Sequence, residues 1–412
     1  MKSLKPIDQP LPATGVRLFP IDNEAVLFDQ CGQRLFHLNP MATRIWRQLD
    51  GHQCVRSIAA AVAGSMDLGE SRANHFVRGM LKEWKRVGIL DGGAAHAPDH
   101  HDRRTMQQKQ QRPSAPAAVL TIPLHGPGRR YQMLDTTVAV FASSEELYGV
   151  VHPALAHLET NAPAATSYRV DIVEIADEIL VLENDRILGS CAGRHCLAPL
   201  LQGIIGLIAL RDFRYLIALH AAALVSADGA LLLAGRSGCG KSTVSAALLS
   251  AGWQYLSDDT ILLCSNSLNV VPMPYSLCLK RGSWSLLAGW LPNLHLLPIH
   301  QREDGREIRY LPPPGADFRQ ERPARWIGFP HRSENGETIV RRLGRLEGLC
   351  RVLEHCCAVP RPLEATDVHH LIQWTARLQF FEFAMGDLSN AVAQIQAVTA
   401  APPTEDDMRL RL

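Results

Sequence analysis

The sequence GRSGCGKST, residues 235–243, predicts a phosphate-binding loop, because it matches the pattern G-x-x-x-x-G-K-[ST] completely. Its glycines let the backbone curl until successive N–H groups face one anion, and a helix that starts there directs its positive dipole end toward the same anion. Lys241 is expected to reach the β- and γ-phosphates of a nucleoside triphosphate, and the Ser242 hydroxyl to hold Mg²⁺. The predicted nucleotide-binding residues are Gly235, Arg236, Ser237, Gly238, Cys239, Gly240, Lys241, Ser242 and Thr243.

The residues around this loop have the composition of strands and a helix. Residues 230–234, ALLLA, form a short apolar run that suits a buried strand, and residues 244–251 continue as a helix that ends at Gly252. Upstream, His220 begins a further strand, and residues 227–229 form a tight turn that leads into the strand before the loop. These features predict an α/β domain built around the phosphate loop.

Two adjacent carboxylates, Asp258 and Asp259, follow the next apolar segment, residues 253–256. Acidic side chains at the end of this strand suit phosphoryl transfer, because one can hold Mg²⁺ and the other can accept the proton of an incoming hydroxyl. Neighbouring side chains on a strand point in different directions, so the two roles can be divided between them. Asp-Asp at a strand end is also ordinary turn chemistry, and the phosphate loop is what favours a catalytic role.

Composition and charge describe an ordinary soluble protein. The chain is 46% hydrophobic and 20% charged, with a formal net charge of +1, so no global electrostatic argument points to nucleic acid or to a membrane. The N-terminus lacks the apolar core of a secretory signal, and the most apolar segment, residues 197–210, is too short to span a bilayer. Ten cysteines without C-x-x-C pairs suggest neither a zinc site nor a disulfide framework, and we expect a cytoplasmic protein.

A change in composition divides the chain into two domains. Residues 92–118 are rich in Ala, His, Asp, Arg, Gln and Pro and are predicted to be a flexible linker. A flexible linker of this length has a root-mean-square span of roughly 25–30 Å. The predicted domains are therefore residues 1–91 and residues 119–412.

The first domain reads as a small winged-helix-like α+β module. Residues 25–28 and 34–38 form a hairpin, and Asn39 caps a helix whose first turn carries a proline. Further helices are predicted at residues 56–63 and 71–87, where apolar residues recur at helical spacing.

Residues 28–46, FDQCGQRLFHLNPMATRIW, followed by LDG and by the closing WKRVGIL, resemble the PqqD-like family over about residues 15–91. In that family the module recognises the leader of a ribosomally made precursor peptide. The resemblance implies that a leader adds a strand to the sheet edge, where backbone hydrogen bonds provide affinity and side-chain pockets provide selectivity. A winged helix that binds DNA is the alternative, and the slight basic excess of residues 1–92 does not decide between them. The residues implied to contact the leader are Arg34, Leu35, Phe36, His37, Phe76 and Met80.

Three features of the second domain, LHAAALV with His220, the phosphate loop and LSDD with Asp258, resemble in their order the kinase domain of the HPr kinase/phosphorylase family and its relatives in peptide-modification clusters. His220 precedes Lys241 by 21 residues, and Lys241 precedes Asp258 by 17. The resemblance implies ATP and Mg²⁺ as cofactors, with Asp258 as general base on a seryl hydroxyl and His220 orienting or polarising that aspartate. It also implies that Ser242 with Asp259 organises Mg²⁺, and that Lys241 stabilises charge on the transferring phosphoryl group.

The chain departs from that family at two places. Thr243 stands where HPr kinases usually carry Glu, and their Arg-Gly loop after the carboxylates is only echoed by residues 280–282, KRG. Arg302, Arg306 and Arg309 are candidates to supply charge to the phosphates, and surface arginines on a loop are the equal alternative.

Together these features predict a cytoplasmic, ATP-dependent kinase that phosphorylates a Ser, or a Thr, of a precursor peptide held through its leader. The tether raises the local concentration of the acceptor, so the active site needs little sequence selectivity. The alternatives are a nucleotide-regulated adaptor or DNA-binding regulator, and a kinase that acts on a small metabolite. Neither a membrane nor nucleic acid is the expected partner, and the resemblance allows a homo-oligomer.

Overall fold

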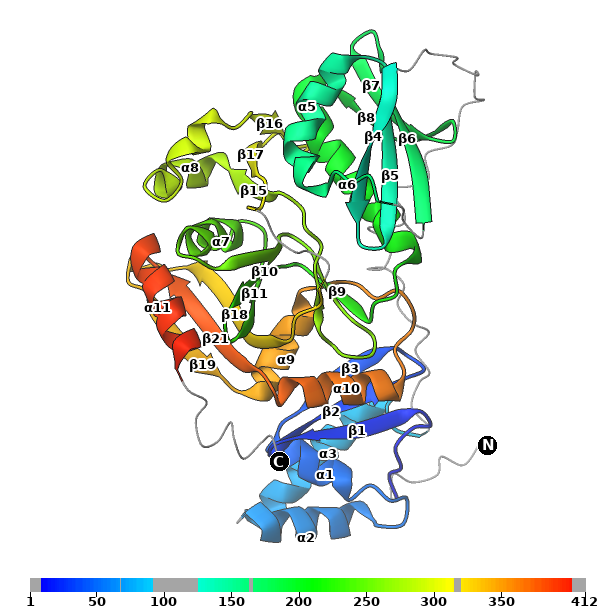
Figure 1. The fold of residues 1–412 in the computed structure, drawn as a ribbon. Helices are drawn as coiled ribbons and strands as arrows, with labels where there is room; N and C mark the ends of the chain where they lie inside the picture. The colour runs from blue at the N-terminus through cyan, green and yellow to red at the C-terminus, as the bar shows by residue number, and fades with distance from the viewer. Residues whose placement is uncertain (1–8, 67, 92–124, 163–165, 315–319, 402–412) are drawn as a thin grey trace. The chain divides into compact units, whose positions relative to one another are not determined.

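The computed structural model describes residues 9–66, 68–91, 125–162, 166–314 and 320–401 (Figure 1). The chain forms two compact units, one from residues 1–111 and 361–374 and the other from residues 112–360 and 375–412. The linker predicted at residues 92–118 lies outside the described residues. The division differs from the expected one in that residues 361–374 group with the N-terminal unit and not with the rest of residues 119–412.

The first unit contains an antiparallel sheet of order β1-β2-β3 and three helices that follow it in the chain. The predicted hairpin and all three predicted helices are confirmed. The first strand was not predicted, because Pro20 interrupts its sequence; proline is tolerated there since β1 is an edge strand. The elements are β1 (Val16–Ile21), β2 (Glu24–Asp29), β3 (Arg34–Leu38), α1 (Pro40–Arg47), α2 (Val55–Met66) and α3 (Glu70–Arg86).

The three helices pack on one face of this sheet. The Asn39 side chain accepts a hydrogen bond of 2.9 Å from the Ala42 N–H, which satisfies one free donor at the start of α1. Trp46 and Trp84 are both buried and meet edge to face, with ring centroids 5.0 Å apart. Leu27 of the central strand belongs to the same apolar cluster. Both tryptophans therefore serve the core.

The opposite face of the sheet is also buried, and residues 361–374 belong to the same unit. Val26 and Phe28 alternate along β2 with Leu27 and so face away from α1 to α3. The Gln33 amide exchanges two hydrogen bonds with the Leu363 backbone, of 2.7 and 3.0 Å, and the Phe19 ring lies 6.3 Å from that of His369. A helix from late in the sequence, α10 (Ala365–Thr375), thus completes the N-terminal unit (Figure 1).

The second unit is organised around a six-stranded sheet of order β12-β10-β11-β18-β21-β19. The central strands β11, β18 and β21 are parallel, and β10 is antiparallel to both of its neighbours. The predicted strand and helix on either side of the phosphate loop are confirmed as β11 and α7. The strands are β10 (Ala221–Ser226), β11 (Gly229–Ala234), β12 (Gln254–Ser257), β18 (Ala324–Arg332), β19 (Ile339–Leu343) and β21 (Gln379–Met385), and the helices beside them are α7 (Lys241–Ser250), α9 (Arg345–Glu354) and α11 (Leu388–Ala400).

A five-stranded sheet of order β4-β5-β6-β7-β8, with two helices, makes a second part of this unit. It comprises β4 (His125–Met133), β5 (Thr136–Ala142), α5 (Glu145–Leu155), β6 (Thr166–Ile175), β7 (Glu178–Glu183), β8 (Arg186–Ala192) and α6 (Leu197–Asp212). The smaller elements are β9 (Ile217–Leu219), β13 (Ile261–Leu263), β14 (Val270–Val271), β15 (Leu277–Lys280), α8 (Arg281–Leu287), β16 (His300–Gln301), β17 (Glu307–Leu311) and β20 (Cys356–Ala358). Among the described helices none is long and apolar enough to cross a membrane.

Gly328, in the middle of β18, tests the packing of the central sheet. A methyl group at this position would overlap the Phe383 ring and lie 3.2 Å from Leu233, so we expect Gly328→Ala to destabilise the unit by about 1–3 kcal/mol. Thermal unfolding should show a midpoint several degrees lower. Gly289→Ala is the matched control, since a methyl group there meets nothing within 4 Å. Equal midpoints for the two variants would contradict the described packing.

Candidate active site

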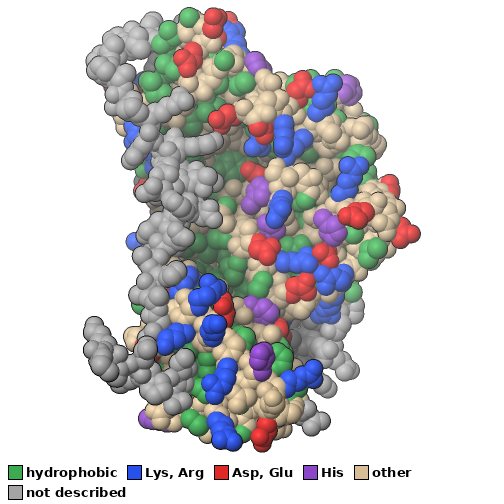
Figure 2. All heavy atoms as spheres, turned by 180° about the vertical axis from the view of Figure 1, so that it is seen from behind, with side chains coloured by type: hydrophobic (Ala, Val, Ile, Leu, Met, Phe, Trp, Pro, Cys, Tyr) green, Lys and Arg blue, Asp and Glu red, His purple; other side chains and the backbone are tan. Residues whose placement is uncertain are grey.

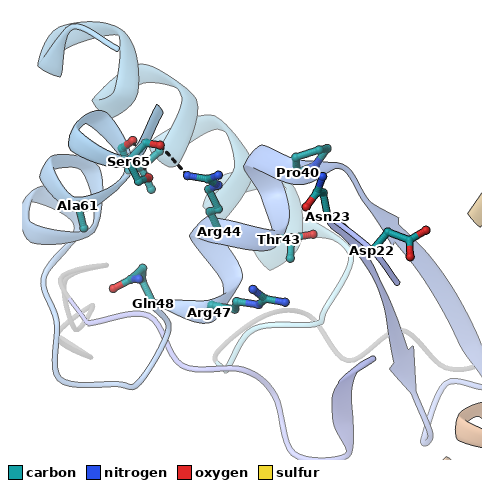
Figure 3. A pocket seen from close by; sticks show the side chains of 10 residues that line it. Asp22, Asn23, Pro40, Thr43, Arg44, Arg47, Gln48, Ala61 and Ser65 are labelled. Carbon is teal, nitrogen blue, oxygen red and sulfur yellow. Dashed lines mark hydrogen bonds between the residues drawn. The ribbon is translucent and has the colours of Figure 1, made fainter. Parts of the chain in front are cut away.

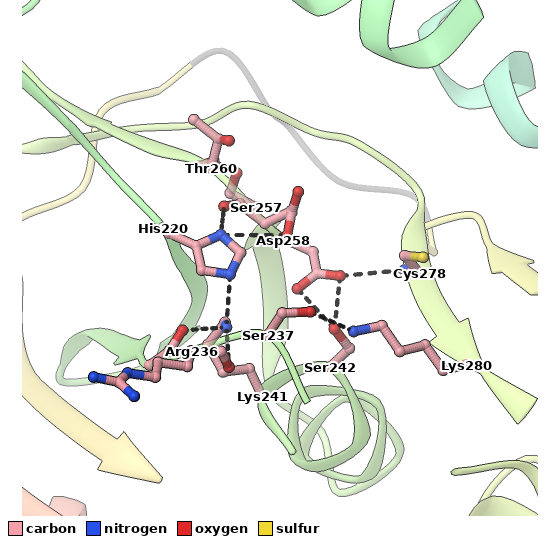
Figure 4. A network of polar contacts seen from close by, with 12 residues as sticks. His220, Arg236, Ser237, Lys241, Ser242, Ser257, Asp258, Thr260, Cys278 and Lys280 are labelled. Carbon is pink, nitrogen blue, oxygen red and sulfur yellow. Dashed lines mark hydrogen bonds and ion pairs between the residues drawn. The ribbon is translucent and has the colours of Figure 1, made fainter. Parts of the chain in front are cut away.

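The topology of the six-stranded sheet brings three chain segments together at one end of its strands. Because β11 and β12 are both antiparallel to β10, their carboxyl ends lie at the edge where β10 begins. The phosphate loop leaves β11, Asp258 and Asp259 leave β12, and His220 immediately precedes β10 (Figure 4). In open α/β sheets ligands bind at the carboxyl ends of the strands. The sequence predicted these residues for one site, and the structure brings them together.

The phosphate loop has a backbone that only glycine adopts readily. Gly238 and Gly240 have φ angles of 91° and 104°, in the left-handed region. A side chain at Gly235 would press on the Cys239 sulfur, with its Cβ 2.7 Å away. Gly240 is the N-cap of α7, so the loop delivers the helix N-terminus to this edge of the sheet. Arg236, Ser237 and Gly238 are exposed, and Thr243 is half-buried in the first turn.

Lys241 is folded back onto its own loop. Its side chain is only 6% exposed, and Nζ donates to the Gly235 carbonyl at 2.6 Å and to the Arg236 carbonyl at 3.3 Å. Burial lowers the pKa of Lys241. The third neighbour of Nζ is His220 Nε2, at 3.1 Å. The ammonium group is therefore surrounded by acceptors and points into the concave side of the loop.

His220 links this lysine to the second aspartate. Its Nδ1 lies 2.9 Å from the Asp259 carbonyl, and because a carbonyl oxygen only accepts, Nδ1 carries the proton. Nε2 is then free to accept from Lys241. Burial and the nearby Lys241 charge lower the pKa of His220, although Asp259 opposes them. Both contacts and the pKa direction favour a neutral imidazole that positions the two neighbouring groups.

Asp258 is a buried carboxylate beside a serine hydroxyl. It is 1% exposed and accepts hydrogen bonds from Ser242 Oγ, at 3.0 and 3.2 Å, and from the Cys278 N–H at 3.1 Å. Burial and the adjacent Asp259 charge raise the pKa of Asp258 to about 6. A hydroxyl and a carboxylate are hard oxygen ligands of the kind that Mg²⁺ prefers, and a cation would offset the unfavourable burial of this charge. Ser242 and Asp258 thus fit a magnesium ion bound with a nucleotide.

Asp259 points in a different direction from its neighbour. Its φ angle of 70° breaks the strand conformation, and its side chain is 60% exposed. One carboxylate oxygen lies 3.4 Å from His220 Nδ1. The pairing expected from the sequence, Ser242 with Asp259 and His220 with Asp258, is therefore exchanged. The left-handed backbone at Asp259 turns this side chain toward solvent, whereas Asp258 is buried against Ser242 in the first turn of α7.

Lys280, which the sequence did not single out, reaches the phosphate loop directly. Its Nζ donates to Ser237 Oγ at 2.7 Å (Figure 4). Arg281 is ion-paired with Glu307 instead. The hydrogen bond from Lys280 was not predicted; the sequence showed residues 280–282 only as an echo of the Arg-Gly loop of HPr kinases.

The three candidate arginines differ in where they lie. Arg302 lies 4.0 Å from Asp304 and is near enough to Cys278 and Asp259 to interact with their charges. Arg306 pairs with Asp304 at 3.7 Å. Arg309 donates to a backbone carbonyl of the segment before β16 and stacks 4.4 Å above the Trp284 ring. Arg302 alone of these three borders the site.

The predicted leader-binding residues lie on β3 and α3 of the N-terminal unit. β3 is an edge strand, hydrogen-bonded to β2 on one side, and no further strand pairs with it in the described part of the chain. Phe36 and Met80 pack on the same apolar cluster, and Phe76 is 42% exposed. Leu35 is partly buried. The two polar positions are held by ion pairs, Arg34 with Asp29 at 2.6 Å and His37 with Glu24 at 3.2 Å.

A cavity that the sequence did not predict lies elsewhere in this unit (Figure 3). It has a volume of about 480 Å³ and lies between the β1–β2 turn, α1 and α2. None of the predicted leader-binding residues contributes to it. Its lining residues are Asp22, Asn23, Pro40, Thr43, Arg44, Arg47, Gln48, Ala61, Val62 and Ser65.

Metal sites of the cysteine and histidine type are absent from the described residues. No group of three or more His, Cys, Asp or Glu side chains is placed there to hold a metal ion, and none of the described cysteines forms a disulfide.

Residues 24–90 match the family described as Coenzyme PQQ synthesis protein D (PqqD). A solved structure, titled "TbiB1 in Complex with the TbiA(beta) Leader Peptide", is similar to 20% of this chain and 95% of its own, with 22% sequence identity and a TM-score of 0.19. No curated protein matches the sequence significantly. The hairpin and the three helices thus form a PqqD-like module, as the sequence predicted.

Proposed function

We propose that this protein is an ATP-dependent kinase that phosphorylates a serine, or a threonine, of a ribosomally made precursor peptide. One observation carries the proposal: a phosphate loop, a buried Ser242–Asp258 pair and a His220-linked Asp259 lie at one sheet edge of a chain that also contains a PqqD-like module. A protein that only binds a nucleotide as a signal needs the loop and a magnesium ligand. A phosphotransferase also needs a group that accepts the proton of the acceptor hydroxyl, and the exposed Asp259 carboxylate can do so.

The loop and α7 would bind the triphosphate, with Lys241 on the β- and γ-phosphates. Ser242 and Asp258 would hold Mg²⁺, which neutralises charge on the phosphates when bound. Opposite this pair, the carboxylate that a peptide hydroxyl can reach is Asp259, since Asp258 is buried and occupied by two donors. We therefore assign the general base to Asp259 and the metal to Asp258, the reverse of the roles that the sequence implied.

In the reaction the acceptor hydroxyl gives its proton to the Asp259 carboxylate while its oxygen attacks the γ-phosphorus. The bond between the γ-phosphorus and the β–γ bridging oxygen breaks, and ADP leaves with the electron pair. His220, held through Nδ1 by the Asp259 backbone, fixes the position of this carboxylate relative to Lys241. Lys241 stabilises the charge that develops on the transferring phosphoryl group.

The PqqD-like module would supply substrate selection. A leader bound to the β3 edge makes the acceptor intramolecular, at an effective concentration in the roughly millimolar range. The active site then needs few contacts around the hydroxyl. Over the upper part of the face in Figure 2, Lys and Arg are interspersed with Asp and Glu, whereas over its lower part they predominate. The choice of a leader over DNA as the partner therefore rests on the PqqD family match and not on surface charge.

Mass spectrometry of the full chain incubated with its cognate precursor and Mg-ATP tests the proposal. We expect a phosphopeptide whose formation slows by about 10²-fold or more when the leader is removed. The leaderless peptide is the matched control for recognition, and ADP in place of ATP is the control for transfer. A different ATP-dependent product, or phosphorylation that is indifferent to the leader, would contradict the proposal.

A further inference from the structure

Resting on the proposed function, we infer that Lys280 is a second cationic contact for the terminal phosphate of the bound nucleotide. Lys280 ends β15, and its ammonium group crosses to the phosphate loop, where it donates to Ser237 Oγ at 2.7 Å. The two residues are 43 positions apart in sequence. A separate strand of the second unit thus brings a positive charge to the tip of the loop.

The position of Ser237 identifies which phosphate this charge would meet. Lys241 Nζ, the expected β- and γ-phosphate ligand, lies at the carbonyls of Gly235 and Arg236, and Ser237 is the next residue. Lys280 therefore approaches the loop at the end occupied by the Lys241 ammonium group. That end is where the triphosphate terminates, and not where the α-phosphate and the nucleoside lie.

Electrostatics support the same placement. The charge of Lys280 lowers the pKa of both Lys241 and His220, so its ammonium group is within interaction range of both. In the described part of the chain the Lys280 ammonium group has no carboxylate within ion-pair distance; its hydrogen-bond acceptor is a neutral hydroxyl. The ammonium groups of Lys241 and Lys280 converge on one loop and repel each other. A polyanion bound between them would attract both and so offset this repulsion.

The neighbouring residue provides an internal comparison. Arg281, at the position that echoes the Arg-Gly loop of HPr kinases, is directed to Glu307 and is largely exposed. The lysine, and not the arginine, therefore faces the phosphate loop. Negative charge is redistributed over the β- and γ-phosphates during transfer, and a cation beside them stabilises it. Lys280 would therefore act on both ATP binding and the rate of transfer.

Calorimetric titration of the full chain with Mg-ADP and with a non-hydrolysable Mg-ATP analogue tests this contact. Lys280→Ala should weaken binding of the ATP analogue about tenfold or more and change ADP affinity less than twofold, since a charge-assisted hydrogen bond to the terminal phosphate is lost. Lys280→Arg should retain the preference for the ATP analogue. Arg281→Ala is the matched control and should leave both affinities unchanged.

Equal losses for the two nucleotides in Lys280→Ala, or an equal effect of Arg281→Ala, would overturn the inference. Thermal unfolding of each variant separates a folding defect from a lost contact. The binding assay needs no peptide, so a chain that discriminates the two nucleotides through Lys280 but forms no phosphopeptide supports this inference and overturns the proposed kinase. A wild-type chain that binds neither nucleotide overturns both.

Discussion

Lys241→Ala should lower the rate of phosphoryl transfer by about 10³-fold or more while the affinity for the leader stays within twofold of wild type. The substitution removes an ammonium group that the loop surrounds with the Gly235 and Arg236 carbonyls and His220 Nε2. Lys241 belongs to the second unit, so its substitution leaves the PqqD-like module unchanged. Single-turnover transfer and fluorescence anisotropy with a labelled leader peptide measure the two properties separately.

The reciprocal variant is Phe76→Ala in the PqqD-like module. Phe76 is 42% exposed on α3, so its loss should reduce leader affinity without unfolding the unit. Nucleotide affinity should not change. If Lys241→Ala lost leader binding and transfer together, the proposed division of labour between the two units would be wrong.

Asn substitutions of the two aspartates should separate their roles. Asp258→Asn should weaken the Mg²⁺-dependent part of ATP affinity, because it removes the charge that with Ser242 is expected to hold the metal. Asp259→Asn should leave that affinity within threefold and slow transfer by about 10²–10⁴-fold, the usual contribution of a general base. The measurements are ATP-analogue affinity with and without Mg²⁺, and single-turnover transfer.

Asp228→Asn is the control for this pair. Asp228 lies in the turn between β10 and β11, at the end of these strands opposite the phosphate loop. It should alter neither property. If Asp259→Asn reduced the Mg²⁺ dependence while Asp258→Asn preserved it, the assignment implied by the sequence would be the correct one.

The sequence was most informative where local chemistry decides local structure. The loop glycines, the apolar run before them and the helix after them predicted β11 and α7, and the Asn39 cap predicted the start of α1. In each case the signal lies within a few residues of the element. The left-handed backbone of Asp259 has no such signal. The resemblance to HPr kinases implied the pairs Ser242–Asp259 and His220–Asp258, whereas in the structure Ser242 contacts Asp258 and His220 contacts Asp259.

Long-range contacts account for the rest. The Gln33 side chain and the Leu363 backbone are 330 residues apart, and neither segment has a sequence pattern that predicts contact with the other. The approach of Lys280 to Ser237 similarly depends on where β15 lies, which the sequence of β15 does not specify. The order β12-β10-β11 likewise followed only from the pairing of strands in the folded sheet.

The membership of residues 361–374 in the N-terminal unit has a consequence for how such proteins can be recombined. A cut in the linker separates the PqqD-like module from the helix that completes it and leaves the Gln33 amide without the Leu363 backbone. Transfer of the module to another enzyme therefore requires two pieces of chain, the N-terminal segment up to residue 91 and the segment that contains α10. An exchange of the module between proteins would have to carry both pieces of chain.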